Sequence, residues 1–364
     1  MIIQAPSGAL PVYVPHPQLL VYPATIADDR VMVAETDSAQ APLVLRDPRV
    51  PLATTVLPDH GTREEIISGW RSVESLCPIA DELWTAFENE GLLVPAGEVP
   101  IRAAAWRSFG WDEAYRYHAS TRDYPFLQMD REGAFEADDA RMAEYIAQSP
   151  PPAITATLPS LRSVPLRKLE AEESADALLE AMPLPERRRL GGLALLMDVC
   201  FGERTRRPFA VQGDFLRKAV PSGGARHPTE AFLAVFSGFS GDEVEPGVYH
   251  YNVEHHRLDL FNEGDHAAAF RHASFDLFDK FHEEPFGLLV FCSLVERAMW
   301  RYRDARSARA PFIDIGHTLM AYRTVIRRLG VGGYTYQKFH DREVTGLLGT
   351  SAERMPPLFL GTLV

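Results

Sequence analysis

The sequence has little cysteine and no long apolar run, and each absence excludes a class of protein. Its three cysteines, Cys77, Cys200 and Cys292, lie far apart and form no Cys-x-x-Cys pair. A structural zinc site or a disulfide framework is therefore not expected, and a cytoplasmic location fits this cysteine usage. No run of about 18 apolar residues is present, so we expect no membrane-spanning helix. No basic segment precedes an apolar one at the N-terminus, so we expect no signal peptide.

Motifs for nucleotide and acyl-transfer chemistry are also missing. The chain has no P-loop, no dinucleotide-binding glycine fingerprint after a strand and no Gly-x-Ser-x-Gly elbow. The net charge of −13 and the lack of a Lys/Arg-rich stripe argue against nucleic acid as a partner. His250, His255 and His256 lack the helical pairing of metalloenzyme ligands. We interpret them as a solvated hairpin turn and predict no metal.

Short apolar runs and helical segments alternate over the first hundred residues. Thr62 and Glu65 form a capping-box pattern that begins one helix, and further patterns predict a second helix over 78–90 and a strand over 92–95. This order is typical of a winged helix. We therefore predict a winged-helix-like domain over residues 1–105, whose lack of basic clusters favours peptide docking or a structural role over DNA binding. A helical, proline-rich connector is predicted over 106–158.

The remaining residues, 159–364, have the pattern of an α+β domain. Helices are predicted over 189–200, 265–280 and 311–329, the last with good start and stop residues. A hairpin is predicted over 248–260, a buried strand over 287–293 and a last strand over 357–361.

The segment from Pro221 to Pro228 is the most informative part of this domain. Two prolines bracket two adjacent glycines, a serine and an arginine, and the apolar run 231–236 follows. Glycine lets backbone N–H groups approach a ligand closely, and Ser222 and Arg226 add donors suited to a phosphate or a polar ring edge. One interpretation is a cofactor cradle feeding a core strand. The other is a tight surface turn, because Gly and Pro punctuate loops generally.

Four blocks of the C-terminal part, from about residue 160 onwards, resemble SagB-type dehydrogenases. These are flavin-dependent members of the nitroreductase-like superfamily that tailor ribosomally made peptides. The blocks are Arg162-Ser163-Val164, Pro221-Ser222-Gly223-Gly224-Ala225, the hairpin 246–251 with Leu258, and Trp300-Arg301-Tyr302-Arg303 followed by Asp314-Ile315-Gly316-His317. The resemblance implies a nitroreductase-like FMN fold, a homodimer that completes the flavin site, a precursor peptide as substrate and a partner modification enzyme.

The resemblance also implies roles for individual residues. Arg301 and Tyr302 would be catalytic and face the substrate. In azoline-oxidising members a Lys-Tyr pair at this point assists deprotonation, whereas Arg301 stays protonated and is a poor base. FMN would be held by Arg162, Ser163, Arg167, Pro221, Ser222, Gly223, Gly224, Ala225, Arg226 and His317.

The residues themselves leave other interpretations open. Arg301 and Tyr302 are also consistent with an ion-paired surface arginine and a packed tyrosine, and His317 with a buried core histidine. The predicted function is an FMN-dependent oxidoreductase that transfers hydride to or from flavin N5 during peptide maturation. The alternatives are a small-molecule NAD(P)H-dependent nitro- or ene-reductase, and a non-catalytic peptide-binding scaffold within a modification complex.

Overall fold

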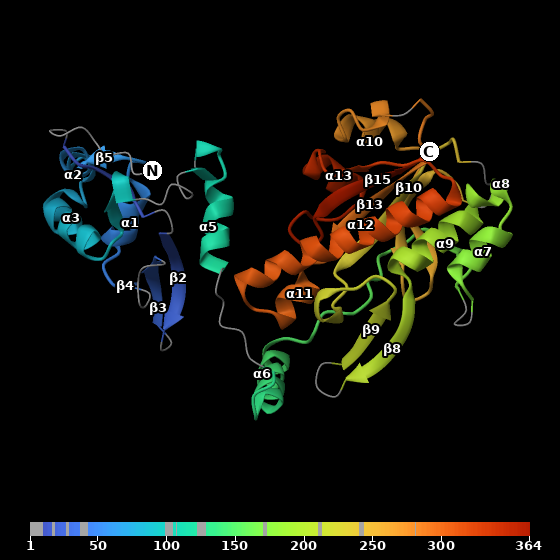
Figure 1. Ribbon diagram of the computed structural model, residues 1–364, viewed down its shortest axis with the longest axis horizontal. Coiled ribbons are helices and arrows are strands. Elements are labelled where there is room, and N and C mark those ends of the chain that lie inside the picture. The colour runs from blue at the N-terminus through green and yellow to red at the C-terminus, as the bar shows by residue number, and fades with distance from the viewer. Residues whose placement is uncertain are drawn as a thin grey trace. The chain divides into compact units, whose positions relative to one another are not determined.

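The computed structural model describes residues 10–16, 19–26, 29–36, 43–98, 105–106, 108–121, 129–169, 173–209, 213–239, 244–280 and 282–364. Its contacts divide the chain into two units, Met1–Pro125 and Phe126–Val364 (Figure 1). Within the described ranges, no helix has both the length and the apolar character needed to cross a membrane. The domain limits expected from the sequence stay predictions.

The first unit combines helices with two small antiparallel sheets, ordered β5-β1-β6 and β2-β3-β4. The expected capping box is present, because Thr62 Oγ1 accepts from the Glu65 N–H and the Glu65 carboxylate accepts from the Thr62 N–H. Trp70, Trp84 and Phe87 form its buried aromatic core. The winged-helix assignment stays a prediction. The elements are β1 (Val12–Pro15), β2 (Leu20–Ile26), β3 (Asp29–Glu35), β4 (Leu43–Leu45), α1 (Arg49–Thr55), β5 (Gly61–Thr62), α2 (Arg63–Arg71), α3 (Ala80–Asn89), β6 (Leu93–Pro95) and α5 (Asp112–Thr121).

The second unit is built on a seven-stranded antiparallel sheet of order β14-β15-β13-β10-β11-β12-β7. A separate ribbon of β8 and β9 extends from it (Figure 1). The strands are β7 (Arg162–Pro165), β8 (Glu203–Phe209), β9 (Gly213–Lys218), β10 (Thr229–Val235), β11 (Gly247–Asn252), β12 (Arg257–Glu263), β13 (Gly287–Ser293), β14 (Thr335–Tyr336) and β15 (Pro357–Leu363). The helices are α6 (Ala134–Gln148), α7 (Ala175–Ala181), α8 (Leu184–Arg187), α9 (Leu190–Phe201), α10 (Ala267–Ala273), α11 (Glu296–Arg301), α12 (Arg309–Leu329) and α13 (Asp341–Leu347).

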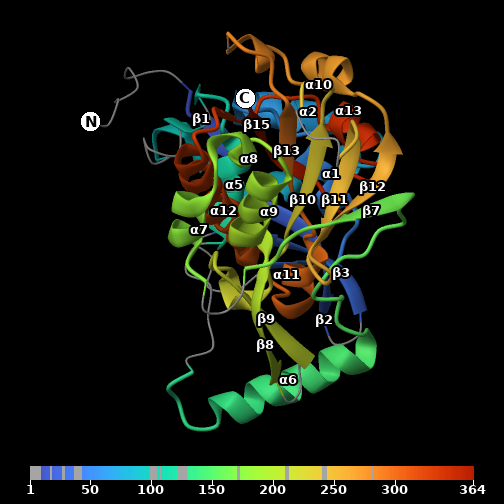
Figure 2. The same cartoon turned by 90° about the vertical axis from the view of Figure 1, so that its right-hand side faces the viewer.

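The core lies on both faces of this sheet. Every residue of β10 and β13 is buried, as the apolar runs 231–235 and 287–292 predict for strands covered on two sides. Leu233 packs in a cluster with α9 and α12, while the next residue on β10, Ala234, packs in a cluster with α10 and α13. Figure 2 shows α9 and α12 side by side. This packing fixes the end of β10 where the Pro221–Pro228 segment enters.

Two expectations were wrong in detail. The helix expected over 265–280 is limited to Ala267–Ala273, because the chain turns at Phe275, whose φ is +52°. The histidines of the hairpin are not a solvated turn. His250 is fully buried and His256 is 6% exposed, because their rings bond to buried polar groups, and of the three only His255 is exposed. No cluster of three or more His, Cys, Asp or Glu residues suited to a metal ion occurs among the described residues.

Candidate functional site

The Pro221–Pro228 segment forms a strained turn just before β10. Gly223–Ala225 make a 3-10 turn (η3) in which Gly224 has a φ of +57°. Ala225 and His227 also have positive φ, +53° and +45°. Residues with a side chain adopt this conformation at a cost of about 1–2 kcal/mol. Such strain persists only where surrounding contacts hold it, and here they come from α12 and α11.

Asp314 of α12 holds the first half of the loop. Its side chain is buried and accepts from Ser222 Oγ at 2.6 Å and from the Gly223 N–H at 3.0 Å. Ser222 Oγ in turn accepts from the His227 N–H at 2.9 Å. Hydrogen bonds to a carboxylate are stronger than those between neutral groups. The buried Asp314 side chain therefore holds the loop to α12 at Gly223 directly and at His227 through Ser222.

Most of the loop's backbone donors are used within the protein. Of the five amides from Gly223 to His227, four donate to protein oxygens at 2.9–3.3 Å. The amide of Gly224 is the one with no partner in the described part of the chain. Gly223 and Gly224 are both exposed. A ligand at this loop would therefore meet two exposed glycines and one free backbone donor, the Gly224 N–H. The other four amides are not available to it.

The hydroxyl of Tyr302 lies against one side of Gly224, which stays exposed elsewhere. A Cβ atom built on Gly224 would lie 1.9 Å from Tyr302 Oη, so this approach requires glycine. Arg226 hydrogen-bonds to the same tyrosine, and its guanidinium lies 4.8 Å from the centre of the Phe215 ring. Arg226 is therefore already engaged by two aromatic side chains at the edge of the loop.

Arg301, the residue before Tyr302, is paired with a carboxylate from another helix. Its Nη2 lies 2.7 and 2.9 Å from the two carboxylate oxygens of Asp138 on α6, and both side chains are largely buried. The indole N–H of Trp300 also donates to the carbonyl of Ser149, just after α6. Arg301 is thus ion-paired, but it lies largely buried rather than on the surface. Its catalytic role stays a prediction.

An apolar groove of about 680 Å³ borders Tyr302, and we call it the α11–α12 groove. A volume of this size is typical of small-molecule sites. The polar residues Tyr302, Arg303, Asp304 and Ser307 lie in its wall, and the other lining residues are apolar. The apolar part of the lining includes Val295, Ala298, Met299, Ala308, Pro311 and Leu358.

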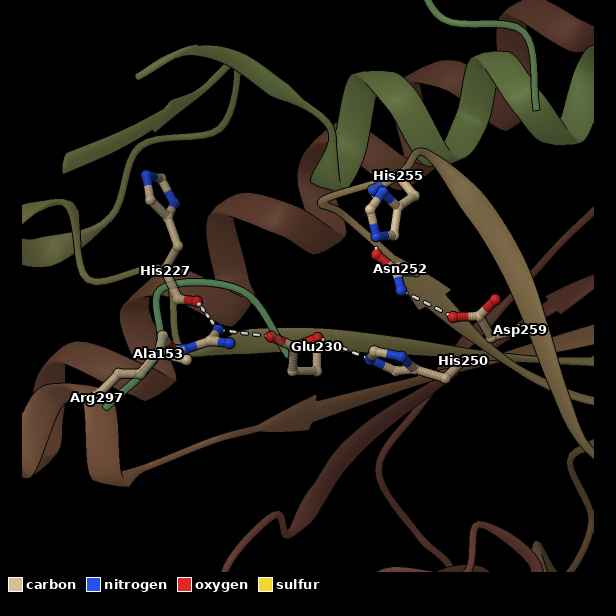
Figure 3. A network of polar contacts seen from close by, with 8 residues as sticks. All are labelled: Ala153, His227, Glu230, His250, Asn252, His255, Asp259 and Arg297. Atoms are coloured by element: carbon tan, nitrogen blue, oxygen red, sulfur yellow. Dashed lines mark hydrogen bonds and ion pairs between the residues drawn. The ribbon is translucent and has the colours of Figure 1, made fainter. Parts of the chain in front are cut away.

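A buried ion network lies at the start of β10 (Figure 3). Glu230 accepts from Arg297 Nη1 at 2.5 Å and from His250 Nε2 at 2.9 Å. Burial alone raises the pKa of Glu230, but the positive charge of Arg297 and the bond from His250 outweigh burial and bring it to about 2. Arg297 also donates to the carbonyls of His227 and Ala153, both at 2.9 Å. It therefore joins the strained end of the loop to α11, the helix that leads into Tyr302.

Lys218, at the end of β9, lines a small cavity beside the loop. The cavity has a volume of about 10 Å³, close to the ~10–15 Å³ that one water needs. Ser222, His227 and Asp314 line it too. Burial lowers the pKa of Lys218 to about 8, and burial together with the charge of Lys218 lowers the pKa of His227 to about 3. Sequence reasoning missed Lys218, although the scarcity of lysine in this chain was an available signal.

The other residues expected to hold FMN lie elsewhere in the same unit. Arg162 and Ser163 are on β7, which two strands separate from β10, a distance of about 14 Å at ~4.8 Å per strand. Arg162 is paired with Glu245, and Ser163 Oγ donates to Asp259 at 2.5 Å. The exposed Arg167, just beyond β7, is paired with Glu173.

His317 lies on the exposed side of α12, three residues after Asp314. Its interpretation as a buried core histidine is therefore wrong. The structure brings Pro221–Arg226 and Tyr302 together, and it does not bring the β7 residues to them within one chain. The FMN-binding roles of all these residues stay predictions.

Comparison with known proteins identifies the fold. No protein-family model matches the chain. The trifolitoxin-processing protein TfxB of Rhizobium leguminosarum bv. trifolii is 38% identical over 163 residues, 44% of this chain and 43% of TfxB. A protein assigned as a nitroreductase from Anabaena variabilis is 19% identical with a TM-score of 0.52, over 69% of this chain and 45% of that chain. A chain of the E. coli microcin synthetase McbBCD complex with truncated pro-MccB17 bound is 23% identical over 47% of this chain and 62% of that one, with a TM-score of 0.40, too low to bear on the fold.

The matched parts span less than half of TfxB and of the Anabaena chain. The likeness to the Anabaena chain shows a nitroreductase-like α+β fold. Together with the similarity to TfxB, it confirms the resemblance to SagB-type, nitroreductase-like proteins.

Proposed function

We propose that this chain is an FMN-dependent oxidoreductase that acts on a ribosomally synthesised peptide. The observation that carries the proposal is the contact between Tyr302 and the exposed glycines of the loop, beside an apolar groove on a nitroreductase-like fold. The similarity to a trifolitoxin-processing protein supports a processing role. The peptide nature of the substrate follows from the resemblance to SagB-type dehydrogenases.

The residues present fit FMN in shape and in charge. Gly223 and Gly224 carry no side chain and are exposed, so a flat ring can approach the backbone closely. The α11–α12 groove supplies apolar walls for a ring or for an apolar substrate group. Exposed arginines such as Arg162 and Arg167 match a phosphate, which guanidinium groups bind well. When bound, FMN would supply two-electron chemistry at N5.

The chain's own residues would orient this chemistry. Tyr302, hydrogen-bonded by Arg226, presents a hydroxyl that can hold or pass a proton at the edge of the loop. Asp314 and Arg297 keep the loop in its strained shape. Arg301, held by Asp138, adds a fixed positive charge next to Tyr302 and is not a base. This departure from a Lys-Tyr pair favours a peptide dehydrogenation or reduction other than azoline oxidation.

We also propose that two copies pair through α12 to complete the site. Phe312, Ile313 and Met320 on this helix are 57–68% exposed, and His317 between them is exposed too. A contiguous apolar face of this kind marks an interaction surface. Arg162 on β7, distant from the loop in one chain, could then reach the loop of the second copy. Ile313→Asp should give a monomer by light scattering and lower the FMN occupancy. Thr324→Asp, farther along the exposed side of α12, tests how far along the helix the dimer contact extends.

For the first unit we propose a docking role. It is a compact unit with its own buried core, distinguished by its contacts from the second unit, and its sequence has no basic cluster. A precursor-peptide leader or a partner modification enzyme is the expected ligand. Binding of the precursor peptide by the full chain, lost on removal of residues 1–125 while FMN stays bound, would support this role.

The first test is the colour of the purified full chain. We expect the two visible absorption bands of an oxidised flavin and the release of about one FMN per chain on denaturation. A protein that stays colourless after added FMN but binds precursor peptide would instead be a scaffold. Flavin-dependent turnover of a nitroaromatic with NAD(P)H, and none of peptide, would favour the small-molecule reductase.

A further inference from the structure

The ribbon of β8 and β9 carries positive charge in an acidic chain. Residues 203–218 contain five basic and two acidic side chains, whereas the whole chain has a net charge of −13. The ribbon extends away from the large sheet, and the end of β9 lies just before the Pro221–Pro228 segment (Figure 1). An anionic ligand attracted to the ribbon would therefore be held close to the candidate site.

The strand register places two arginines on one face of the ribbon. Arg207 is opposite Phe215, and Thr205 is opposite Arg217. Side chains of directly opposed residues share a face, and so do those two positions apart along a strand. We call these four residues the arginine face. Leu216 is buried on the other face, so the arginine face is the one toward solvent, and Thr205, Arg207 and Arg217 are exposed.

The two arginines of this face have no carboxylate partner. Neither Arg207 nor Arg217 makes an ion pair with any residue inside the described ranges, whereas Arg206, on the other face, pairs with two glutamates. Asp214 lies on that other face too, because it is opposite Pro208. Arg207 and Arg217 are diagonal neighbours, which in a ribbon places their β-carbons ~7–8 Å apart. Their like charges repel, and a bound carboxylate would offset this repulsion while accepting two N–H bonds from a guanidinium.

Arg226 connects the arginine face to the loop. Its guanidinium lies 4.8 Å from the centre of the half-buried Phe215 ring, and it hydrogen-bonds to Tyr302. Positive charge therefore continues from Arg207 and Arg217 to the edge of the candidate site. An extended peptide with acidic side chains at alternate positions fits this arrangement, because alternate side chains of a strand point the same way and lie ~7 Å apart.

We propose that the arginine face binds an acidic segment of the substrate peptide and thereby brings the residue to be modified to the loop. The inference rests on the proposed function, in which the substrate is a peptide, and adds that this peptide carries carboxylates near the modified residue. Arg207 and Arg217 each bind a carboxylate of the extended segment. Phe215, between them, contacts the aliphatic part of its side chains. The net negative charge of the chain as a whole disfavours binding of the same segment elsewhere.

The test uses a synthetic octapeptide of alternating glutamate and threonine that carries an uncharged fluorophore. Its affinity for the purified full chain is measured by fluorescence anisotropy and should fall as the salt concentration rises. The same peptide with glutamine in place of glutamate should bind about tenfold more weakly, and so should the glutamate peptide to the double variant Arg207→Gln/Arg217→Gln, because charge-assisted bonds are lost. Arg189→Gln with Arg342→Gln is the matched control, since both arginines are exposed and neither is ion-paired within the described ranges. It should bind as the wild type does.

FMN occupancy and oligomeric state separate this role from others. The double variant should keep the FMN content and the light-scattering mass of the wild type. A loss of FMN that matches the loss of peptide would assign the arginines to the FMN phosphate, and a change in mass would assign them to a second copy; either result overturns the proposal.

The choice of ligand gives the remaining outcomes. Equal affinity for the glutamate and glutamine peptides, or tighter binding of a thymidine octanucleotide than of the glutamate peptide, overturns the proposal while the proposed function stands. A chain that binds the glutamate peptide through Arg207 and Arg217 but takes up no FMN overturns the oxidoreductase function and supports the arginine face as a site for acidic peptides.

Discussion

The hydroxyl of Tyr302 lies so close to the α-carbon of Gly224 that a methyl group on Gly224 would meet it at 1.9 Å. The contact joins the loop before β10 to the residue that ends α11. Asp314 on α12 and Arg297 on α11 both hydrogen-bond to the loop, at Gly223 and at His227. The contact between the loop and Tyr302 therefore depends on the absence of a side chain at Gly224.

Replacement of Gly224 by alanine should displace Tyr302 or the loop and lower FMN affinity at least tenfold. The new Cβ has no room, and alanine adds a strain of about 1–2 kcal/mol at a φ of +57°. The measurement is the dissociation constant of FMN by fluorescence quenching. Gly330→Ala is the matched control, because Gly330 has a φ of +69° and nothing within 4 Å of its Cβ position. It should lose stability but keep FMN affinity; equal FMN loss in both variants would contradict the role of the contact.

Replacement of Asp314 by asparagine should weaken FMN binding about tenfold with a smaller effect on stability. The amide oxygen can still accept from the Gly223 N–H, but one acceptor and the negative charge are lost, so Ser222 Oγ loses its strong partner. The loop would then relax from its strained φ values. Calorimetric FMN titration measures the effect. Asp279→Asn, at an exposed aspartate paired with Arg271, should leave FMN affinity unchanged.

Replacement of Arg297 by methionine should destabilise the second unit by about 3–5 kcal/mol. Removal of Arg297 leaves the buried Glu230 carboxylate without its guanidinium and held by His250, and the carbonyl of His227 loses its donor. The free energy of opening of β10, measured by hydrogen exchange, reports the change in this unit. Arg271→Met, which breaks exposed pairs, should cost at most about 1 kcal/mol. A double variant with Glu230→Gln should recover part of the loss, and no recovery would show that Arg297 acts through packing alone.

Local elements of this fold could be predicted because their signals lie in adjacent residues. The apolar runs of β10 and β13, the capping box at Thr62 and the αL stop of α12 at Gly330 all depend on neighbours in sequence. The strained loop was also singled out by its glycines. Such patterns report on local conformation and on which faces are buried.

The partners across the site could not be predicted in this way. Arg301 and Asp138 are 163 positions apart, and Arg297 and Glu230 are 67 apart, so nothing in either local pattern specifies the pair. The prediction of a solvent-exposed His250 fails for the same reason, because the buried ring bonds to Glu230 on another strand. Long-range ion pairs of this kind are set by sheet order and helix packing, which follow from the whole fold.

Acidification should destabilise the second unit in two steps, the first controlled by His227. The pKa of His227 is lowered from 6.5 to about 3 by burial, so the unfolded chain binds this proton first. The stability that the neutral, buried ring contributes is complete above pH 6.5 and is lost as the pH falls from 6.5 toward 3. The slope reaches about 1.4 kcal/mol per pH unit for one proton. Glu230, with a pKa of about 2 against an ordinary 4.5, adds a loss in the same direction below pH 4.5.

Hydrogen exchange of β10 peptides at pH 7, 6 and 5, corrected for the intrinsic pH dependence of exchange, isolates the His227 step, because the Glu230 step begins only below pH 4.5. His227→Asn removes the titrating ring, and asparagine tolerates the φ of +45° at this position. The difference in opening free energy between wild type and variant should therefore shrink as the pH falls from 7 to 5. His272→Gln, at a histidine whose side chain is 79% exposed, should show a constant difference. A wild-type stability that stays level between pH 7 and 5 would mean that His227 is protonated in the folded protein, and the cavity beside Lys218 would then hold two positive charges rather than one.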